Sequence, residues 1–133
     1  MKKDINVLIE KLNAPTKRER LSALKDIIAL EKAGEIEKPV TGTSVNNHIH
    51  TTYSFSPYSP TAAVWFAREA GLCTCGMMDH DSIAGAEEFL AAAEAANMSA
   101  TIGIECRVSF KNTPFADRKL NNPDHAGVVY MAL

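Results

Sequence analysis

Strand-like and helix-like segments alternate along most of this 133-residue chain, and this alternation limits its possible folds more than any other feature. The predicted strands are residues 45–50, 73–79, 100–110 and 127–133. The predicted helices between the first three strands are residues 59–71 and 82–93, where apolar side chains recur at helical spacing. Alternating strands and helices form parallel βαβ units, so the sequence predicts an α/β fold with parallel strands.

Residues that favour helix ends flank both of these helices. Ser59 is a predicted N-cap with Pro60 at the first helical position, and Gly71 ends that helix. Asp81 or Ser82 is the predicted N-cap of the next helix. Its predicted inner face consists of Ile83, Ala86, Phe89, Leu90 and Ala93.

Residues 1–40 form a separate helical pattern before the first strand. The apolar stripe of the first helix is Ile5, Leu8, Ile9 and Leu12, and Pro15 ends that segment. Thr16 and Glu19 have the spacing of a capping box, which begins a second helix that stops near Gly34. We therefore expect a helical hairpin that caps or covers the domain formed by residues 41–133.

The composition excludes several classes of protein. Hydrophobic residues make up 46% of the chain and the formal charge is -2, so the surplus of basic residues typical of nucleic-acid binding is missing. No apolar stretch approaches the roughly 20 residues of a membrane span, and the first residues do not resemble a secretory signal. Three cysteines without an export signal favour reduced thiols, so we expect a cytoplasmic protein with no membrane partner.

Metal-ligating side chains end three successive strands. His48 and His50 lie at i and i+2, which places both imidazoles on one face of a strand. Asp79 and His80 end the next strand, and Glu105 lies in the third. Because functional groups of parallel α/β folds gather at the C-terminal ends of the strands, we expect these residues to meet at one rim, where the three histidines and Glu105 can bind divalent Zn, Mn or Fe.

Some of these residues have plausible structural roles instead. Glu105 in an apolar strand requires a partner, either a cation or a salt bridge to Arg107, and we favour the metal. Asp79 and Asp81 could each cap the following helix, and capping is our preferred interpretation for Asp81.

The cysteines and two aromatic residues are predicted to serve packing. Cys73 and Cys75 lie early in their strand, away from the expected metal site, and small apolar thiols such as these and Cys106 are common in protein cores. Trp65 and Tyr130 are likewise interpreted as packing residues rather than substrate platforms.

Three short motifs carry the candidate ligands in order along the chain. The first is His48-Ile49-His50-Thr51 followed by Tyr53-Ser54, the second is Asp79-His80-Asp81 followed by Gly85, and the third is Gly103-Ile104-Glu105. Together these motifs, within residues 45–110, resemble the PHP (polymerase and histidinol phosphatase) family. Since the match ends well before the later strands of such a domain, it corresponds to the N-terminal portion of the family.

This resemblance implies a distorted (β/α)7 barrel, a centre of two or three metal ions, and metal-dependent hydrolysis of phosphate esters. It implies that His48, His50 and Glu105 hold one ion, that Glu105 bridges to a second, and that His80 binds a third. Asp79 is implied to be a ligand or to orient an imidazole. His48, His50, His80 and Glu105 are then the catalytic residues.

The substrate implied by this centre is a phosphorylated small molecule or a nucleotide. The candidate contacts to its phosphate group are Tyr53, Ser54, Ser56 and Arg107. Many family members place an Asp or His shortly after the Tyr-Ser pair as a further ligand, whereas this chain has Phe55 and Ser56 there.

The chain is short for the implied fold, because a complete barrel of this kind needs about 200 residues or more. We therefore expect residues 41–133 to form a truncated partial barrel that self-associates or needs a C-terminal region. His125 precedes the fourth strand, which would place it towards the opposite rim of a parallel sheet. An amidohydrolase-type hydrolase, which also begins with a His-x-His strand, and an incomplete non-catalytic metal-binding module are the alternatives to a phosphoesterase.

Overall fold

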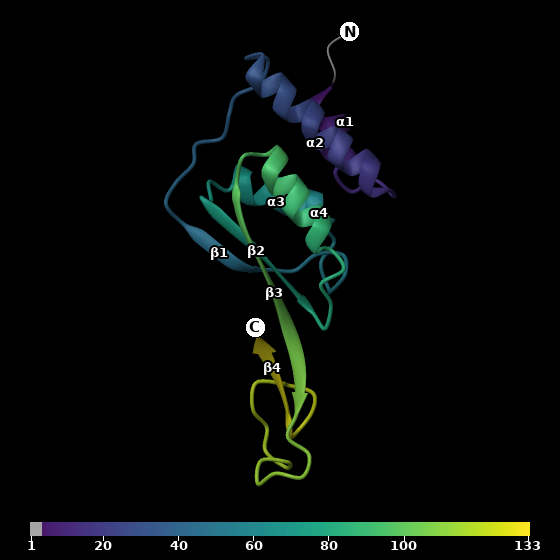
Figure 1. Cartoon of the computed structure of the whole chain (residues 1–133), viewed down its shortest axis with the longest axis vertical. Coiled ribbons are helices and arrows are strands. Elements are labelled where there is room, and N and C mark those ends of the chain that lie inside the picture. Colours follow the sequence, from purple (N-terminus) through teal and green to yellow (C-terminus); the bar gives the residue numbers. More distant parts are fainter. Residues whose placement is uncertain (1–3) are drawn as a thin grey trace.

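The computed structural model describes residues 4–133 and has three layers (Figure 1). A helical hairpin packs on a pair of helices, and this pair covers one face of a sheet whose last two strands project away from the helices (Figure 1). The elements are α1 (Ile5–Lys11), α2 (Lys17–Lys32), β1 (Val45–Ile49), α3 (Pro60–Glu69), β2 (Thr74–His80), α4 (Ala86–Ala95), β3 (Ser99–Ser109) and β4 (Val128–Ala132). The predicted α/β architecture is confirmed, with the sheet forming part of a barrel.

Two of the predicted helix starts are confirmed by their hydrogen bonds. Thr16 and Glu19 form a reciprocal capping box at the start of α2. The Ser59 hydroxyl accepts a hydrogen bond from the Ala62 amide at the start of α3, where Pro60 is the first helical residue. In both helices the capping side chain accepts a hydrogen bond from a backbone amide that has no partner within the helix.

The predicted start of α4 is wrong. The helix begins at Ala86 after Gly85, with no side-chain capping bond. The Asp81 carboxylate is instead engaged by Arg107, and the Ser82 hydroxyl accepts from Ala84 within the preceding turn. Residues 81–85 are not helical, so Ile83 lies outside the helix and is exposed. Leu90 lies within the helix and is also exposed. The buried apolar residues of α4 and its C-cap are Phe89, Ala92, Ala93 and Ala96.

The sheet has the order β1-β2-β3-β4, and its first three strands are parallel as predicted. In contrast, β4 runs antiparallel to β3. The loop between them contains no helix that could carry the chain back to the start of the sheet, so the two strands form a long hairpin. β4 pairs with residues 105–109, starting where the pairing of β2 with β3 ends, and the hairpin therefore extends past the end of β2 (Figure 1).

The antiparallel direction of β4 also changes the position of His125. Val128 pairs with Ser109 at the far end of β3, so the residues just before β4 lie at the distal end of the hairpin. The prediction that His125 lies towards the opposite rim of a parallel sheet is therefore wrong. His125 is exposed in this distal loop, where its backbone amide donates to the Asn122 side chain.

Strong curvature brings the outer strands β1 and β3 together over β2. The side chains of Asn47 in β1 and Thr101 in β3 are within hydrogen-bonding distance at 3.1 Å. They meet over Gly76 of β2, where a Cβ atom would lie 2.3 Å from the Thr101 hydroxyl and 2.7 Å from the Asn47 Cα. A shift in register between Asn46 and Ile49 marks an irregularity in β1, and such bulges increase the local twist of a strand.

The hairpin of α1 and α2 is fixed to the rest of the molecule by buried ion pairs. Arg20 of α2 binds Glu88 of α4, and the Thr61 hydroxyl of α3 donates to the same carboxylate. Arg68 of α3 binds Glu31 near the other end of α2 through two guanidinium nitrogens. The hairpin thus packs on the outer side of α3 and α4, and its role as a cap or lid remains a prediction.

None of the helices within residues 4–133 combines the length and the apolar character needed to cross a bilayer.

Candidate metal centre

Three imidazole rings converge on one carboxylate at the end of the parallel strands. The Oε2 atom of Glu105 lies 3.1 Å from Nε2 of His48, 3.3 Å from Nε2 of His50 and 3.5 Å from Nε2 of His80. His48 belongs to β1, His50 directly follows it, His80 ends β2 and Glu105 lies in β3. The predicted convergence of these four residues is therefore present in the fold.

The spacing of these atoms is compatible with a metal ion. Nε2 of His48 and Oε2 of Glu105 are within hydrogen-bonding distance at 3.1 Å, whereas the distances of 3.3 Å from His50 and 3.5 Å from His80 exceed the usual range of about 2.7–3.2 Å. Two ligand atoms bound at about 2.0–2.1 Å to a tetrahedral zinc ion lie roughly 3.3 Å apart. The nitrogen and oxygen atoms of His48, His50 and Glu105 also lie within 4.8 Å of one another as a group. The donor set therefore fits a divalent ion.

The three rings pack against one another. The ring centroids of His48 and His50 are 5.1 Å apart, and those of His50 and His80 are 4.8 Å apart. Burial and the nearby His80 lower the pKa of His50, while Glu105 acts in the opposite direction. A lowered pKa keeps the imidazole neutral, which is the form that binds metals.

Asp79 does not join this cluster, although it was a predicted ligand. Its side chain is fully buried beneath the loop that follows β1. One carboxylate oxygen accepts hydrogen bonds from the Thr51 amide at 2.6 Å and from the Ser54 hydroxyl at 3.0 Å, and the other accepts from the Thr51 hydroxyl at 2.7 Å. These bonds direct the carboxylate to the loop, so its position favours the predicted orienting role over direct ligation.

Of the predicted phosphate contacts, Ser54 is buried and Ser56 is half-buried, whereas Tyr53 and Arg107 reach the surface. The Ser54 hydroxyl is directed inward, 2.8 Å from Nδ1 of His50. Tyr53 is 48% exposed and lies against Gly85, at the start of α4.

Arg107 forms an ion pair with Asp81, whereas the contacts of Glu105 are with the three histidines. The Asp81 carboxylate accepts hydrogen bonds from the backbone amide and from Nε of Arg107. These bonds lower the pKa of Asp81 and raise the pKa of Arg107. The alternative in which Arg107 neutralises Glu105 is therefore wrong, and so is the N-cap interpretation of Asp81.

Three residues near the histidines were not assigned to the site from the sequence. Thr51 is fully buried and bonds Asp79. Tyr130 of β4 packs on His80 with ring centroids 4.8 Å apart, and Phe55 approaches the same ring edge-on at 5.3 Å. Asp79 is an acidic residue in an apolar strand, and a buried carboxylate needs hydrogen-bond donors nearby. This requirement was the sequence signal that could have identified Thr51. The contact of Tyr130 depends on the antiparallel return of β4 and had no comparable signal.

Cys73 and Cys75 lie at the start of β2, away from the candidate metal centre, whereas Cys106 directly follows Glu105 in β3. Cys75 is buried in the core, and this burial raises the pKa of its thiol to about 11. The Cys73 thiol donates to the Ser44 carbonyl. Within residues 4–133, the group of potential metal ligands found contains His48, His50 and Glu105 and no cysteine. Core packing was the predicted role of all three cysteines, and the position of Cys75 agrees with it, whereas Cys73 and Cys106 are only partly buried.

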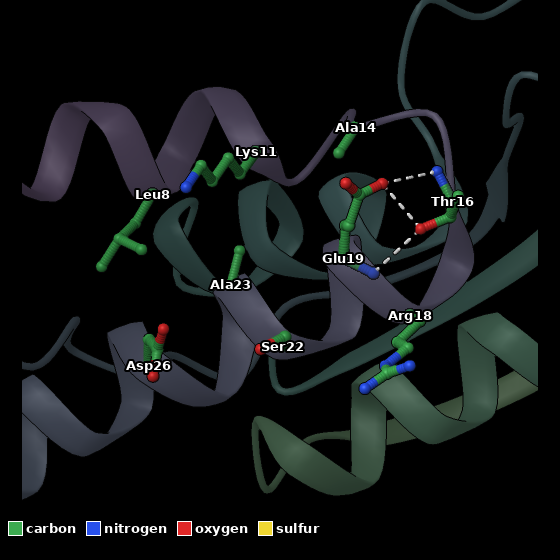
Figure 2. A pocket seen from close by; sticks show the side chains of 9 residues that line it. All are labelled: Leu8, Lys11, Ala14, Thr16, Arg18, Glu19, Ser22, Ala23 and Asp26. Carbon is green, nitrogen blue, oxygen red and sulfur yellow. Dashed lines mark hydrogen bonds between the residues drawn. The ribbon is translucent and has the colours of Figure 1, made fainter.

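A cavity of about 550 Å³ lies along the helical hairpin (Figure 2), and no histidine lines it. It is lined by Leu8, Lys11, Ala14, Thr16, Arg18, Glu19, Ser22, Ala23 and Asp26. Its walls include the Thr16–Glu19 capping box, so part of its polar surface is already used to stabilise α2 (Figure 2). None of the predicted site residues lines this cavity.

Comparison with known proteins identifies the family. Among solved structures, the chain is similar to a proposed metal-dependent phosphoesterase from Bifidobacterium adolescentis, with 27% identity and a TM-score of 0.48. The similarity covers 58% of this chain and 26% of that protein, so the chain spans about a quarter of its length. A search of curated proteins gave no match. The family model described as PHP domain matches residues 46–130. Because this match covers more than half of the chain and includes all four converging residues, the chain belongs to the PHP domain family.

Proposed function

We propose that this chain carries the first ligands of a metal-dependent phosphoesterase centre. The observation that carries the proposal is the approach of three histidine Nε2 atoms to Oε2 of Glu105, at 3.1 to 3.5 Å. Three neutral imidazoles and one carboxylate suit Zn, Mn or Fe. His48, His50, His80 and Glu105 are the proposed ligands and the catalytic residues of this centre.

These residues create a site that favours an anionic substrate. When bound, a divalent ion supplies a coordinated water of lowered pKa and neutralises charge on a phosphoryl group. The ligand set contributes a single negative charge, from Glu105, so the site keeps a net positive charge towards the phosphate. Arg107 is 61% exposed, and its side chain is proposed to contact a phosphoryl oxygen while Asp81 holds its Nε.

The proposed substrate is a phosphorylated small molecule or a nucleotide. Tyr53 is half exposed and is proposed to contact the part of the substrate beyond the phosphate. Ser54 is proposed to act on the histidines rather than on the substrate, since its hydroxyl is directed into the protein.

Metal analysis combined with hydrolysis of p-nitrophenyl phosphate tests this function. The purified protein is expected to bind Zn, Mn or Fe and to release p-nitrophenol, and His50→Ala is expected to lose metal and at least about a hundredfold in rate, comparable to removing a major catalytic group. His125→Ala is the matched control, because it removes the histidine in the distal loop and is expected to leave both unchanged.

Two results would contradict the proposal. Absence of bound metal after incubation with each of the three ions would remove its basis, as would an unchanged rate in His50→Ala. Stoichiometric metal without any hydrolysis would instead identify the chain as a non-catalytic metal-binding module.

A further inference from the structure

The hydroxyl group of Ser54 has three polar neighbours in the interior of the protein. The backbone amide of His80 donates to it at 2.9 Å, Oδ1 of Asp79 lies at 3.0 Å, and Nδ1 of His50 lies at 2.8 Å. Ser54 is 7% exposed and Asp79 is fully buried, so these contacts are shielded from water. The hydroxyl therefore connects the residues that end β1 and β2.

The number of protons available decides the direction of each bond. A hydroxyl group donates one hydrogen bond and accepts two. The His80 amide can only donate, and an ionised Asp79 carboxylate can only accept. Ser54 consequently donates its single proton to Asp79 and accepts from His80 with one lone pair.

The third contact then has only one possible direction. Since the proton of Ser54 is already used by Asp79, the hydroxyl must accept from Nδ1 of His50 with its second lone pair. A neutral imidazole carries one N–H, so its other nitrogen keeps a lone pair. In His50 this other nitrogen is Nε2, which faces Glu105 at 3.3 Å.

We infer that Ser54 and Asp79 are positioning residues that hold His50 in the Nδ1–H tautomer and so reserve its Nε2 lone pair for a cation. The inference rests on the metal-binding part of the proposed function and adds the residues that prepare one ligand. Thr51 completes the arrangement, because its amide and hydroxyl supply the remaining donors to Asp79 and fix the direction of that carboxylate.

The tautomer can be read directly by long-range ¹H–¹⁵N NMR on the metal-free protein at about pH 8, above the ordinary imidazole pKa of about 6.5. His50 is expected to show a protonated Nδ1 and an unprotonated Nε2. In Ser54→Ala the acceptor is lost, so a substantial fraction of His50 is expected to move its proton to Nε2. Ser56→Ala is the matched control, because it removes the hydroxyl of a half-buried serine in the same loop.

Metal affinity gives a second measurement. Zn²⁺ binding, followed by competition with a chelating dye, is expected to weaken about 10–100-fold in Ser54→Ala, the usual effect of removing a group that orients a ligand. Ser54→Thr, which keeps the hydroxyl, is expected to restore the wild-type tautomer and most of the affinity. If Ser54→Ala does not fold, the tautomer of His50 in the wild-type protein remains the test.

The outcomes separate this inference from the proposed function. An Nε2–H tautomer of His50 in the wild-type protein would overturn the inference, and so would a Ser54→Ala variant whose tautomer matches that of Ser56→Ala. Because the tautomer is measured without metal or substrate, failure of the phosphatase assay would leave this result intact.

Discussion

At the scale of single residues, Gly76 allows two strands that are not neighbours to meet. β1 and β3 lie on opposite sides of β2, and strands two positions apart in a flat sheet are roughly 9–10 Å apart. In this sheet Cα atoms of β1 and β3 nevertheless lie within 8 Å of one another. The close approach requires that the residue of β2 beneath Asn47 and Thr101 has no side chain.

Gly76→Ala is therefore expected to impair stability and metal binding together. Its Cβ would lie 2.7 Å from the backbone of Asn47, so β1 must shift, and overpacking of this kind costs about 1–3 kcal/mol. Because β1 carries His48, zinc affinity is expected to fall as well. Urea unfolding and zinc titration measure the two effects.

Gly34→Ala provides a control with the same chemical change at a different place. Gly34 has a φ of +72°, and a Cβ atom added to it would meet no other atom within 4 Å, so alanine is expected to cost about 1–2 kcal/mol through its backbone alone. Its zinc affinity should equal that of the wild type. If Gly76→Ala also kept full zinc affinity, the proposed link between curvature and the metal site would be wrong.

At the scale of elements, α2 is held by a buried ion pair near each end. Arg20 and Glu88 have side-chain exposures of 13% and 3%, and Arg68 and Glu31 have exposures of 10% and 5%. Burial by itself would raise the pKa of Glu88, but hydrogen bonds from Arg20 and Thr61 outweigh it, and the pKa falls below its ordinary value of 4.5. The hairpin is thus part of the same packed structure as α3 and α4.

Arg20→Ala is expected to lower the free energy of unfolding by about 3–5 kcal/mol, because it leaves the Glu88 carboxylate buried without its partner. Arg18→Ala, two residues earlier on the exposed side of α2, is expected to change it by less than about 0.5 kcal/mol. Urea unfolding at pH 7 measures both variants. Equal stabilities would show that the pair does not fix the hairpin.

The pH dependence follows from the sign of the shift. A lowered pKa in the folded state gives stability that is complete above the ordinary pKa of 4.5 and is lost as the pH falls through the folded-state value. The difference between wild type and Arg20→Ala is therefore expected to be largest at neutral pH and to shrink in acid. A difference that grows below pH 4.5 would contradict this account.

At the scale of the whole molecule, the sheet has two edge strands with exposed apolar side chains. Val45 on β1 is 52% exposed and Met131 on β4 is 46% exposed. Within residues 4–133 the helices pack on one face of this sheet (Figure 1). Unpaired edges and exposed apolar residues favour association with further strands.

We therefore expect the 133-residue chain to self-associate, with a sedimentation coefficient that rises with concentration. Met131→Lys places a charge on the β4 edge and is expected to reduce the association. Val7→Lys is the control, because Val7 has a matching exposure of 45% but lies on α1. A compact monomer at all concentrations would contradict the prediction, and equal effects of the two variants would exclude the β4 edge as the contact.

Much of the fold and of the candidate site could be predicted because they depend on local patterns and on the order of the strands. Apolar periodicity located the helices and strands, Thr16 with Glu19 marked a capping box, and three parallel strands in series required their ends to meet. The position of His48, His50, His80 and Glu105 at one end of the sheet follows from that topology.

The positions that could not be predicted depend on contacts between segments distant in the sequence. Arg107 captures Asp81, which removes it from the start of α4, and the loop after β3 turns β4 antiparallel, which brings Tyr130 to His80. The sequence alone therefore determined the order of the elements and which side chains gather at the ends of the strands, because these follow from periodicity and strand order. Only the tertiary structure decided the curvature over Gly76 and the direction of each bond around Ser54, because those depend on which atoms the folded chain brings within a few ångströms of each other.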